Sequence, residues 1–238
     1  MRLDQYLCIH KGIESRNKAQ QLIKEGAVWV NQKQESKSSR KVNDRDRVSI
    51  HSRLQFVSRG GHKLQAALQH FQISLQEKLC IDVGASTGGF TDCMLQAGAK
   101  SVLAIDVGTQ QLHPSIRENP RVITLEKTDI RTFTNPPFHC DFLAADLSFI
   151  SVSMCMESIA HLMKPTSLAI LLIKPQFEAG LMGYKRDYIP LGRLRDKVIA
   201  HCISCITAYP FTILGRIPSP IPGAKKGNIE ELVFVERL

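Results

Sequence analysis

The chain has 238 residues, of which 43% are hydrophobic, and a formal net charge of +9. This apolar fraction is ample for a packed core and excludes an intrinsically disordered chain, and the length suits two domains of unequal size. Residues 1–63 hold 14 Lys and Arg against 6 Asp and Glu, whereas residues 64–238 hold 17 against 16. A small basic module beside a nearly neutral one predicts a polyanionic partner, most simply a nucleic acid; a solvated surface without a partner is the alternative.

The cysteines and the apolar runs bear on the cellular compartment. The seven cysteines have no disulfide-like spacing, which indicates reduced thiols, and we expect the lone Cys-x-x-Cys at Cys202 and Cys205 to be buried rather than to bind metal. The N-terminus has no apolar core of signal-peptide length, and the longest strongly apolar run, Leu168–Ile173, is too short to cross a bilayer. The sequence therefore predicts a soluble cytoplasmic protein with no metal and no membrane partner, and it indicates no obligatory protein partner.

Residues 1 to about 50 are expected to form two short helices followed by strands. Ser15 is placed to cap the second helix and Gly26 to end it, and Ala27–Asn31 is predicted to be a strand. Lys33–Lys41 is expected to be a polar, charged loop, and Asp46–Ile50 to close the unit as a strand. Apolar residues recur at helical spacing in both helices: Leu3, Tyr6, Leu7, Ala19, Leu22 and Ile23.

The cations of this module are candidates for contact with a phosphate backbone, since Arg16, Lys18 and Lys24 fall within the second helix or at its start. The segment carries the pattern Arg2-Leu3-Asp4-x-x-Leu7, Ser15-Arg16-x-x-Ala19-x-x-Leu22-Ile23-x-x-Gly26-x-Val28-x-Val30-Asn31, and Val48. In these residues it resembles the S4 RNA-binding domain, and a basic helical cap that binds no RNA fits them less well. The predicted RNA-binding residues are Arg2, Arg16, Lys18, Lys24 and Arg59.

A second unit starts at Ser58, after a linker over His51–Val57, with a helix expected from about Gly61 to Phe71. From Leu79 onward strands and helices alternate, which predicts an α/β fold with a mostly parallel sheet and helices on both faces. The expected strands are Leu79–Val83, Ser101–Asp106, Arg121–Thr124, Phe142–Ala145, Ser167–Ile173, Thr212–Gly215 and Glu231–Glu236. The expected helices are Gly88–Ala97, Ser151–Met163 and Gly192–Tyr209.

A Gly-rich turn follows the first strand of this alternation. The stretch Asp82-Val83-Gly84-Ala85-Ser86-Thr87-Gly88-Gly89-Phe90 comes directly after Leu79-Cys80-Ile81. Such a turn between a strand and a helix lets backbone amides approach a ligand closely, because glycine has no Cβ. The turn lacks the Gly-x-Gly-x-x-Gly spacing that seats a dinucleotide pyrophosphate, which disfavours an NAD-dependent oxidoreductase.

Three carboxylates come at or just beyond the ends of later strands or in the loops that follow them: Asp106, Asp129 and Asp146. In an open parallel sheet, ligands bind beyond the carboxyl ends of the strands. A row of acids there suits a ligand with ribose hydroxyls, an amine and a positive centre, and S-adenosylmethionine has all three. Solvation at a strand end is the alternative for a single aspartate, and the joint spacing of the three favours a cofactor site.

Lys174 directly follows the apolar run Leu171–Ile173 and precedes Pro175. A lysine at the end of a buried strand is costly unless it is paired, and its pKa is easily shifted. A solvent-facing strand end is the alternative, and Asp146 at the end of the neighbouring strand favours a paired, functional lysine. Such an amine can accept the proton of a ribose hydroxyl, or stabilise the developing alkoxide, as the oxygen attacks a methyl group.

Six further motifs lie in order along the chain: Ser58-Arg59-Gly60-Gly61-x-Lys63-Leu64, Asp82–Asp92, Asp106-Val107-Gly108, Asp146-Leu147-Ser148-Phe149-Ile150-Ser151, Ile173-Lys174-Pro175-Gln176-Phe177-Glu178 and Gly227-Asn228-Ile229-Glu230. Together they resemble the TlyA family, whose members join an S4 domain to an FtsJ-like methyltransferase. The resemblance implies a Rossmann-like class I methyltransferase fold with a seven-stranded, mostly parallel sheet at residues 58–238, and an α+β S4-like domain with its linker at residues 1–57. It implies 2′-O-methylation of cytidine in ribosomal RNA with S-adenosylmethionine as donor. Family members act on large-subunit RNA and some also on small-subunit RNA, and the short C-terminus here resembles the form restricted to 23S RNA.

The resemblance also implies a role for each matching residue. Lys174 is the principal base, Asp146 and Glu230 tune and orient it, and Lys63 grips the ribose or its phosphate. The Gly-Asn-x-Glu pattern favours Glu230 over the adjacent Glu231, and the segment Ala179–Pro190 follows the family less closely. The residues implied for cofactor binding are Gly84, Gly88 and Phe90 on the methionine side, Asp106 at the ribose hydroxyls, Asp129 at the adenine, and also Ala85, Ser86 and Asp146.

Two other functions stay open at this point. One is an RNA-binding or ribosome-assembly protein without catalysis, which the complete set of lysines and carboxylates opposes. The other is a haemolysin-like virulence factor, an association that the family name carries. A pore needs a membrane-spanning helix or a barrel of strands, and the sequence predicts neither.

Overall fold

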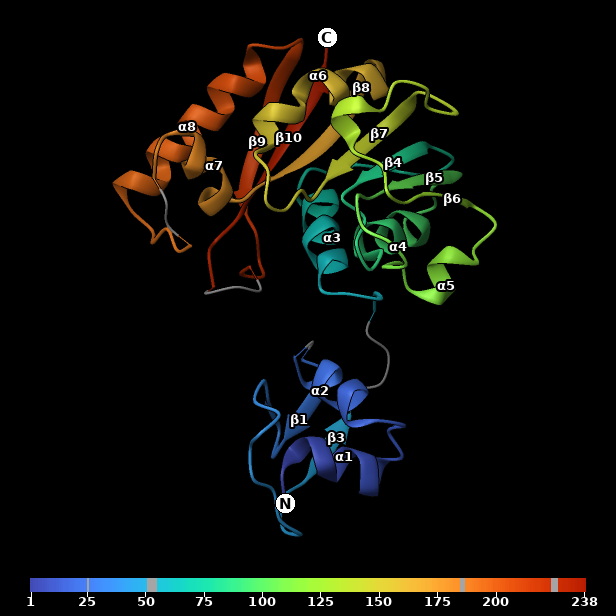
Figure 1. The fold of residues 1–238 in the computed structure, drawn as a ribbon, viewed down its shortest axis with the longest axis vertical. Coiled ribbons are helices and arrows are strands. Elements are labelled where there is room, and N and C mark those ends of the chain that lie inside the picture. The colour runs from blue at the N-terminus through green and yellow to red at the C-terminus, as the bar shows by residue number, and fades with distance from the viewer. Residues whose placement is uncertain (25, 51–54, 185–186, 224–226) are drawn as a thin grey trace. The chain divides into compact units, whose positions relative to one another are not determined.

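The chain forms two compact units, Met1–Ser58 and Arg59–Leu238 (Figure 1). The computed structural model describes residues 1–24, 26–50, 55–184, 187–223 and 227–238. Residues 51–54, which belong to the expected linker, and residues 185–186, within the segment that follows the family less closely, lie outside the described residues.

The N-terminal unit packs two helices on a small antiparallel sheet. The helices are α1 (Leu3–Lys11) and α2 (Arg16–Lys24), and the strands β1 (Val28–Val30), β2 (Lys33–Gln34) and β3 (Val48–Ile50) lie in the order β2-β1-β3. The apolar residues expected at helical spacing meet here in one core, as Leu3, Leu7, Ala19 and Ile23 are fully buried. Ser15 caps α2 as predicted, because its Oγ accepts the Lys18 N–H at 3.2 Å.

The prediction of a loop over Lys33–Lys41 is wrong at its start. Lys33 and Gln34 pair with β1 as a short strand, in the register Val30↔Lys33 and Trp29↔Gln34. The turn between the strands has positive φ at both central residues, 52° at Asn31 and 65° at Gln32. Positive φ at both positions is the geometry of a tight two-residue hairpin, and the backbone therefore pairs despite the polar side chains.

The C-terminal unit contains a seven-stranded sheet within its described residues, in the order β6-β5-β4-β7-β8-β10-β9. Its strands are β4 (Leu79–Val83), β5 (Ser101–Ile105), β6 (Val122–Leu125), β7 (Cys140–Ala145), β8 (Met163–Ile173), β9 (Phe211–Pro218) and β10 (Glu231–Arg237). Only β10 opposes its neighbours, pairing antiparallel with both β8 and β9. The mostly parallel sheet expected from the sequence is confirmed.

Helices cover both faces of this sheet (Figure 1). The α-helices are α3 (Gly60–His70), α4 (Gly89–Gln96), α5 (Pro114–Arg117), α6 (Met156–Leu162), α7 (Pro175–Leu181) and α8 (Arg193–Thr207), with 3₁₀ turns η1 (Ile130–Thr132) and η2 (Val152–Cys155). The expected helix over Ser151–Met163 is wrong in part, because it divides into η2 and α6 and its last residue begins β8. The backbone leaves the helical region at Cys155, with φ −112° and ψ 0°.

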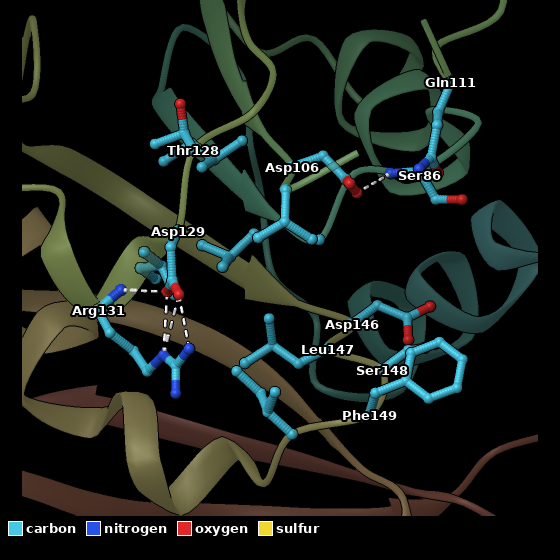
Figure 2. Close-up of a pocket in the computed structure, with 16 residues that line it drawn as sticks. Ser86, Asp106, Gln111, Thr128, Asp129, Arg131, Asp146, Leu147, Ser148 and Phe149 are labelled. Atoms are coloured by element: carbon cyan, nitrogen blue, oxygen red, sulfur yellow. Dashed lines mark hydrogen bonds and ion pairs between the residues drawn. The ribbon is translucent and has the colours of Figure 1, made fainter. Parts of the chain in front are cut away.

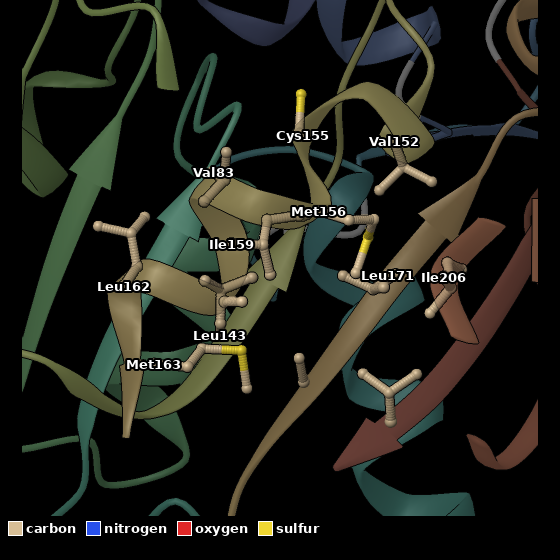
Figure 3. Packing of buried hydrophobic residues seen from close by; sticks show 14 of the residues in the cluster. Val83, Leu143, Val152, Cys155, Met156, Ile159, Leu162, Met163, Leu171 and Ile206 are labelled. Atoms are coloured by element: carbon tan, nitrogen blue, oxygen red, sulfur yellow. The ribbon is translucent and has the colours of Figure 1, made fainter. Parts of the chain in front are cut away.

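The main core lies between one face of the sheet and the helices α6 and α8 (Figure 3). Alternate strand residues point into it, as the period of two requires: Ile81, Val83, Leu143, Leu171, Val233 and Val235. Phe234, between two of these, faces the opposite side and stacks on Phe71, just beyond α3, with ring centroids 4.9 Å apart. In the described ranges of the chain, no helix is both long and apolar enough to cross a membrane.

Candidate active site

A cavity of about 280 Å³ opens at the carboxyl ends of the parallel strands. Gly84, which follows β4, lines this cavity. Asp106 after β5, Asp129 beyond β6 and Asp146 after β7 line it as well (Figure 2). In sheets of this kind, ligands bind at this edge. The three carboxylates predicted from the sequence to bind a ligand therefore line the same cavity.

Gly84 allows two strand ends to approach each other closely. Its φ is +83°, and a Cβ on it would lie 2.7 Å from the carbonyl oxygen of Asp146. A larger residue would therefore push β4 away from β7 and strain the turn. The glycine predicted from the Gly-rich stretch serves first to close the cavity floor.

The Asp106 carboxylate is held by two backbone N–H groups. Oδ2 accepts from Ser86 at 2.8 Å, and Oδ1 accepts from Gly108 at 2.7 Å. These bonds tie the Gly-rich turn after β4 to the loop after β5 and fix the direction of the carboxylate. Each carboxylate oxygen has a second lone pair, so Asp106 can still accept hydrogen bonds from a ligand in the cavity.

Asp129 is paired with a residue that the sequence prediction did not include. Arg131 Nη2 lies 2.6 Å from Asp129 Oδ2, and Arg131 Nε lies 3.0 Å from Oδ1 (Figure 2). The Arg131 guanidinium holds the pKa of the Asp129 carboxyl below its usual value, although partial burial opposes it. Arg131 also lines the cavity, so a ligand here meets the two side chains as one planar unit.

Lys174 follows β8 and forms an ion pair in which the lysine is buried and its partner, Asp146, is partly exposed. Its Nζ lies 2.5 Å from Asp146 Oδ1 and donates to Ser148 Oγ at 2.8 Å, and the residue is only 8% exposed. The ring of Phe177 has its centroid 5.9 Å from the same nitrogen. The amine is thus shielded from water and held in one direction at the edge of the cavity that Asp146 and Ser148 line.

A second buried ion pair joins Lys63 of α3 to Glu230, with Nζ and Oε2 2.5 Å apart. Both residues are nearly inaccessible, 8% and 3% exposed. The register Glu231↔Ile173 places Glu230 beside the end of β8, where Lys174 follows. Glu230 forms its ion pair with Lys63, and its role in tuning and orienting Lys174 stays a prediction.

The adjacent carboxylate, Glu231, faces a different partner. Its Oε2 accepts from Arg195 of α8 at 2.6 Å, and Oε1 lies 3.4 Å from Arg216. Neighbouring residues of a strand point to opposite faces, so only one of the two glutamates can reach Lys63. The structure selects Glu230, as the sequence pattern favoured.

Three residues expected at the cofactor do not line the cavity that the described residues form: Ala85, Gly88 and Phe90. Phe90 is 3% exposed and lies within α4, and Gly88, with φ +93°, precedes that helix against Leu112 and Ile116. Their place at a cofactor stays a prediction.

Asp82 is the first residue of the Gly-rich stretch and is fully buried. Its Oδ2 accepts from the N–H and hydroxyl of Thr91, at 2.9 and 2.6 Å, while Oδ1 has no hydrogen-bond partner within the described part of the chain. Burial, with the nearby Asp146 charge, raises the pKa of Asp82 to about 7. No role was predicted for this side chain.

Two further residues were quoted in motifs but were assigned no role. Phe149 is 76% exposed at the cavity wall, has a φ of +69°, and lies 5.5 Å from the ring of Phe177. Glu178 of α7 is buried and accepts from Ser151 Oγ and, at 2.9 Å, from the Val152 N–H. Burial raises the pKa of Glu178. The carboxyl thus fastens the loop after β7 to the helix after β8.

Most of the predicted RNA-binding cations lie in the N-terminal unit. The side chains of Arg2, Arg16 and Lys18 are 41%, 52% and 54% exposed. Lys24 ends α2, and its side chain is outside the described part. Arg59 belongs to the C-terminal unit, where its Nη2 donates to the Pro222 carbonyl at 2.6 Å.

A seven-stranded sheet of this order, with one antiparallel strand and a cavity across the carboxyl ends, defines a class I methyltransferase fold. The chain belongs to the FtsJ-like methyltransferase family, whose model matches residues 56–235, and residues 1–48 match the S4 domain. It is 40% identical to Hemolysin A of Brachyspira hyodysenteriae, over 98% of both chains. It is 34% identical to the 16S/23S rRNA (cytidine-2′-O)-methyltransferase TlyA of Mycobacterium tuberculosis, over 95% of this chain and 87% of that protein. A solved structure described as a candidate hemolysin of Streptococcus thermophilus has 34% identity and a TM-score of 0.77, covering 100% of this chain and 88% of the other.

Proposed function

We propose that this protein transfers a methyl group from S-adenosylmethionine to the ribose 2′-hydroxyl of a cytidine in ribosomal RNA, in the cytoplasm. Residues 58–238 carry the transfer and residues 1–57 bind the RNA. The observation that carries the proposal is the buried Lys174–Asp146 ion pair at the edge of the cavity. The activity of the TlyA relative supports the substrate class.

The residues around the cavity fit the proposed cofactor. A volume of about 280 Å³ is near the lower bound of small-molecule sites, roughly 300 Å³. Asp106 keeps lone pairs that would hold the ribose hydroxyls, the Asp129–Arg131 unit would hold the adenine, and Asp146 would stabilise a positive centre. When bound, S-adenosylmethionine supplies the electrophilic methyl group.

Lys174 removes the obstacle to the reaction, the tightly held proton of the ribose hydroxyl. After its own proton has left to solvent, the neutral amine accepts this proton as the oxygen forms its new bond, and Asp146 stabilises the ammonium that results. Ser148 accepts a hydrogen bond from the same amine and keeps it aimed at the hydroxyl. Acid–base help of this kind contributes roughly 10²–10⁴-fold to a rate.

The Lys63–Glu230 pair positions the target nucleotide beside Lys174. Lys63 is too buried to hold a phosphate in bulk solvent, and Glu230 neutralises its charge. The pair thus supplies a rigid, polar wall next to the base, and correct placement of reacting groups accounts for a large share of a barrier reduction. Phe149, exposed at the cavity wall, offers a ring on which the target base can stack.

The test is transfer of labelled methyl groups to ribosomal RNA by the purified protein, with mass-spectrometric mapping of ribose methylation in cells with and without the gene. We expect one cytidine to lose its 2′-O-methyl group when the gene is absent. RNA binding without any transfer would instead favour the assembly-protein alternative. Mapping of both 16S and 23S RNA decides which subunit carries the mark.

A further inference from the structure

The N-terminal unit contains a buried carboxylate to which two of its arginines are bonded. Asp4 has no exposed surface, although it lies in the first turn of α1. Its two oxygens accept five hydrogen bonds: from Arg2 Nε and Nη2 at 3.0 Å, from Arg16 Nη2 at 3.1 Å, from Gln20 Nε2 at 2.8 Å, and from the Gln5 N–H at 3.0 Å. The Arg2 guanidinium is the main cause of a strongly lowered Asp4 pKa.

The two arginines converge on this one carboxylate from separate elements. Arg2 precedes α1 and binds both oxygens as a fork, whereas Arg16 begins α2 and binds Oδ2 with one nitrogen. Both guanidinium groups therefore lie side by side, and their side chains remain 41% and 52% exposed. A guanidinium has five N–H donors, so most donors of the pair are left for an anion outside.

We infer that Asp4 is a positioning residue that assembles Arg2 and Arg16 into a binding site for one RNA phosphate. The inference rests on the proposed function, because it specifies how the N-terminal unit holds its RNA. Arginine side chains lose conformational entropy when they are immobilised at an interface. Asp4 fixes both of them before the RNA arrives, so binding does not incur this cost.

A simple charge model predicts the opposite effect of Asp4. A carboxylate near a polyanion weakens binding, so removal of its charge ought to strengthen it. The positioning role instead predicts that Asp4→Asn weakens RNA binding roughly tenfold, since two arginines lose their anchor. Asp44→Asn is the matched control, because Asp44 is exposed in the same unit and the change adds the same charge.

The experiment measures binding of the full-length variants to purified 23S ribosomal RNA at fixed salt, with circular dichroism as a check on folding. Weaker binding by Asp4→Asn together with unchanged or tighter binding by Asp44→Asn supports the inference. Equal or tighter binding by a folded Asp4→Asn overturns it. If Asp4→Asn does not fold, Arg16→Lys decides, since it keeps the charge but loses the planar group: weaker binding supports the site and unchanged binding overturns it.

A double-mutant cycle separates positioning from simple loss of stability. Once Asp4→Asn has released the arginines, Arg16→Lys is expected to cost little more, and fully additive losses contradict the inference. Methyl transfer by the wild-type protein, measured alongside, reports on the proposed function separately. If the wild-type protein transfers methyl groups and Asp4→Asn binds RNA normally, only the proposed phosphate site is overturned. If the wild-type protein binds no RNA, the phosphate site and the proposed function are both overturned.

Discussion

The two ends of one strand pair carry the same kind of ion pair in different surroundings. At the amino ends of β7 and β8, Lys164 Nζ lies 2.7 Å from Asp141 Oδ1, and the side chains are 45% and 25% exposed. At the carboxyl ends, Lys174 Nζ lies 2.5 Å from Asp146 Oδ1, and the side chains are 9% and 22% exposed. The distances are similar, so the burial of the lysine is what distinguishes the pairs.

This difference separates a structural contact from a chemical one. An exposed ion pair contributes about 0–1 kcal/mol to stability and is screened by salt. A buried lysine carries a desolvation penalty, and it is retained only where a partner compensates it. Since ligands bind at the carboxyl ends of a parallel sheet, the buried pair lies where such an amine can meet a substrate.

The largest expected effect comes from removing the two lysines in turn. Lys174→Met keeps the side-chain volume but removes the amine, so methyl transfer should fall by roughly 10²–10⁴-fold. Lys164→Met, on the same strand, should stay within about twofold of wild type, because an exposed pair has little energetic weight. Single-turnover transfer to ribosomal RNA measures both. A folded Lys174→Met protein with near-normal turnover would remove Lys174 from the mechanism.

Removing the charge of each partner aspartate should give the same difference between the two ion pairs, with a smaller loss of rate. Asp146→Asn removes the charge that stabilises the Lys174 ammonium, and we expect a loss of roughly 10–100-fold in kcat. Asp141→Asn should leave kcat unchanged and lower the melting temperature slightly, since Asp141 Oδ2 also accepts the Leu79 N–H at 2.9 Å. Equal rate losses in the two variants would show that the burial of the partner lysine is not what matters.

Glu178 tests what holds the buried pair in place. It fastens the loop that carries Asp146 to the helix that follows Lys174, so Glu178→Ala should reduce kcat about tenfold through misplacement of the two groups. Glu178→Gln keeps an oxygen that accepts from Val152 and should restore most of the rate. The ratio of the two kcat values at unchanged RNA affinity is the readout. No rescue by glutamine would argue that the negative charge, rather than the clamp, is required.

The smallest expected effect concerns Asp82, a buried carboxyl with no cationic partner described. Its folded pKa of about 7 lies above the unfolded value near 3.9, so folding favours the protonated form. Its contribution to stability is therefore complete below about pH 4 and is lost as the pH rises through 7. Asp82→Asn should flatten the change in melting temperature between pH 5.5 and pH 8. A mutant whose pH dependence matched that of wild type would mean that Asp82 is not the group that titrates.

Local patterns in the sequence were sufficient for most elements of the fold. The bounds of β4 were predicted without error, because a short apolar strand followed by glycines leaves little ambiguity. The hairpin at Lys33–Gln34 was missed, since its side chains are polar and only the backbone of β1 makes it a strand. The helix α7 was missed because a proline follows Lys174, although proline suits the first turn of a helix.

For the candidate site too, the sequence predicted some features and missed others. Motifs in the chain identified Lys63, Asp146, Lys174 and Glu230, but not which lysine meets which carboxylate. Arg131 had no distinguishing local signal, since a surface arginine is common, and Glu178 stands in a quoted motif that assigned it no role. Their importance follows from contacts with Asp129 and with the loop at Ser151.

The sequence alone determined most of the strands and helices, the Gly-rich turn and the basic character of the first unit, because periodicity, glycine content and charge are properties of neighbouring residues. Only the tertiary structure decided the pairing of Lys63 with Glu230, residues 167 positions apart, and the exposure that separates Lys164 from Lys174. Burial depends on how distant elements pack, and no local pattern contains that information.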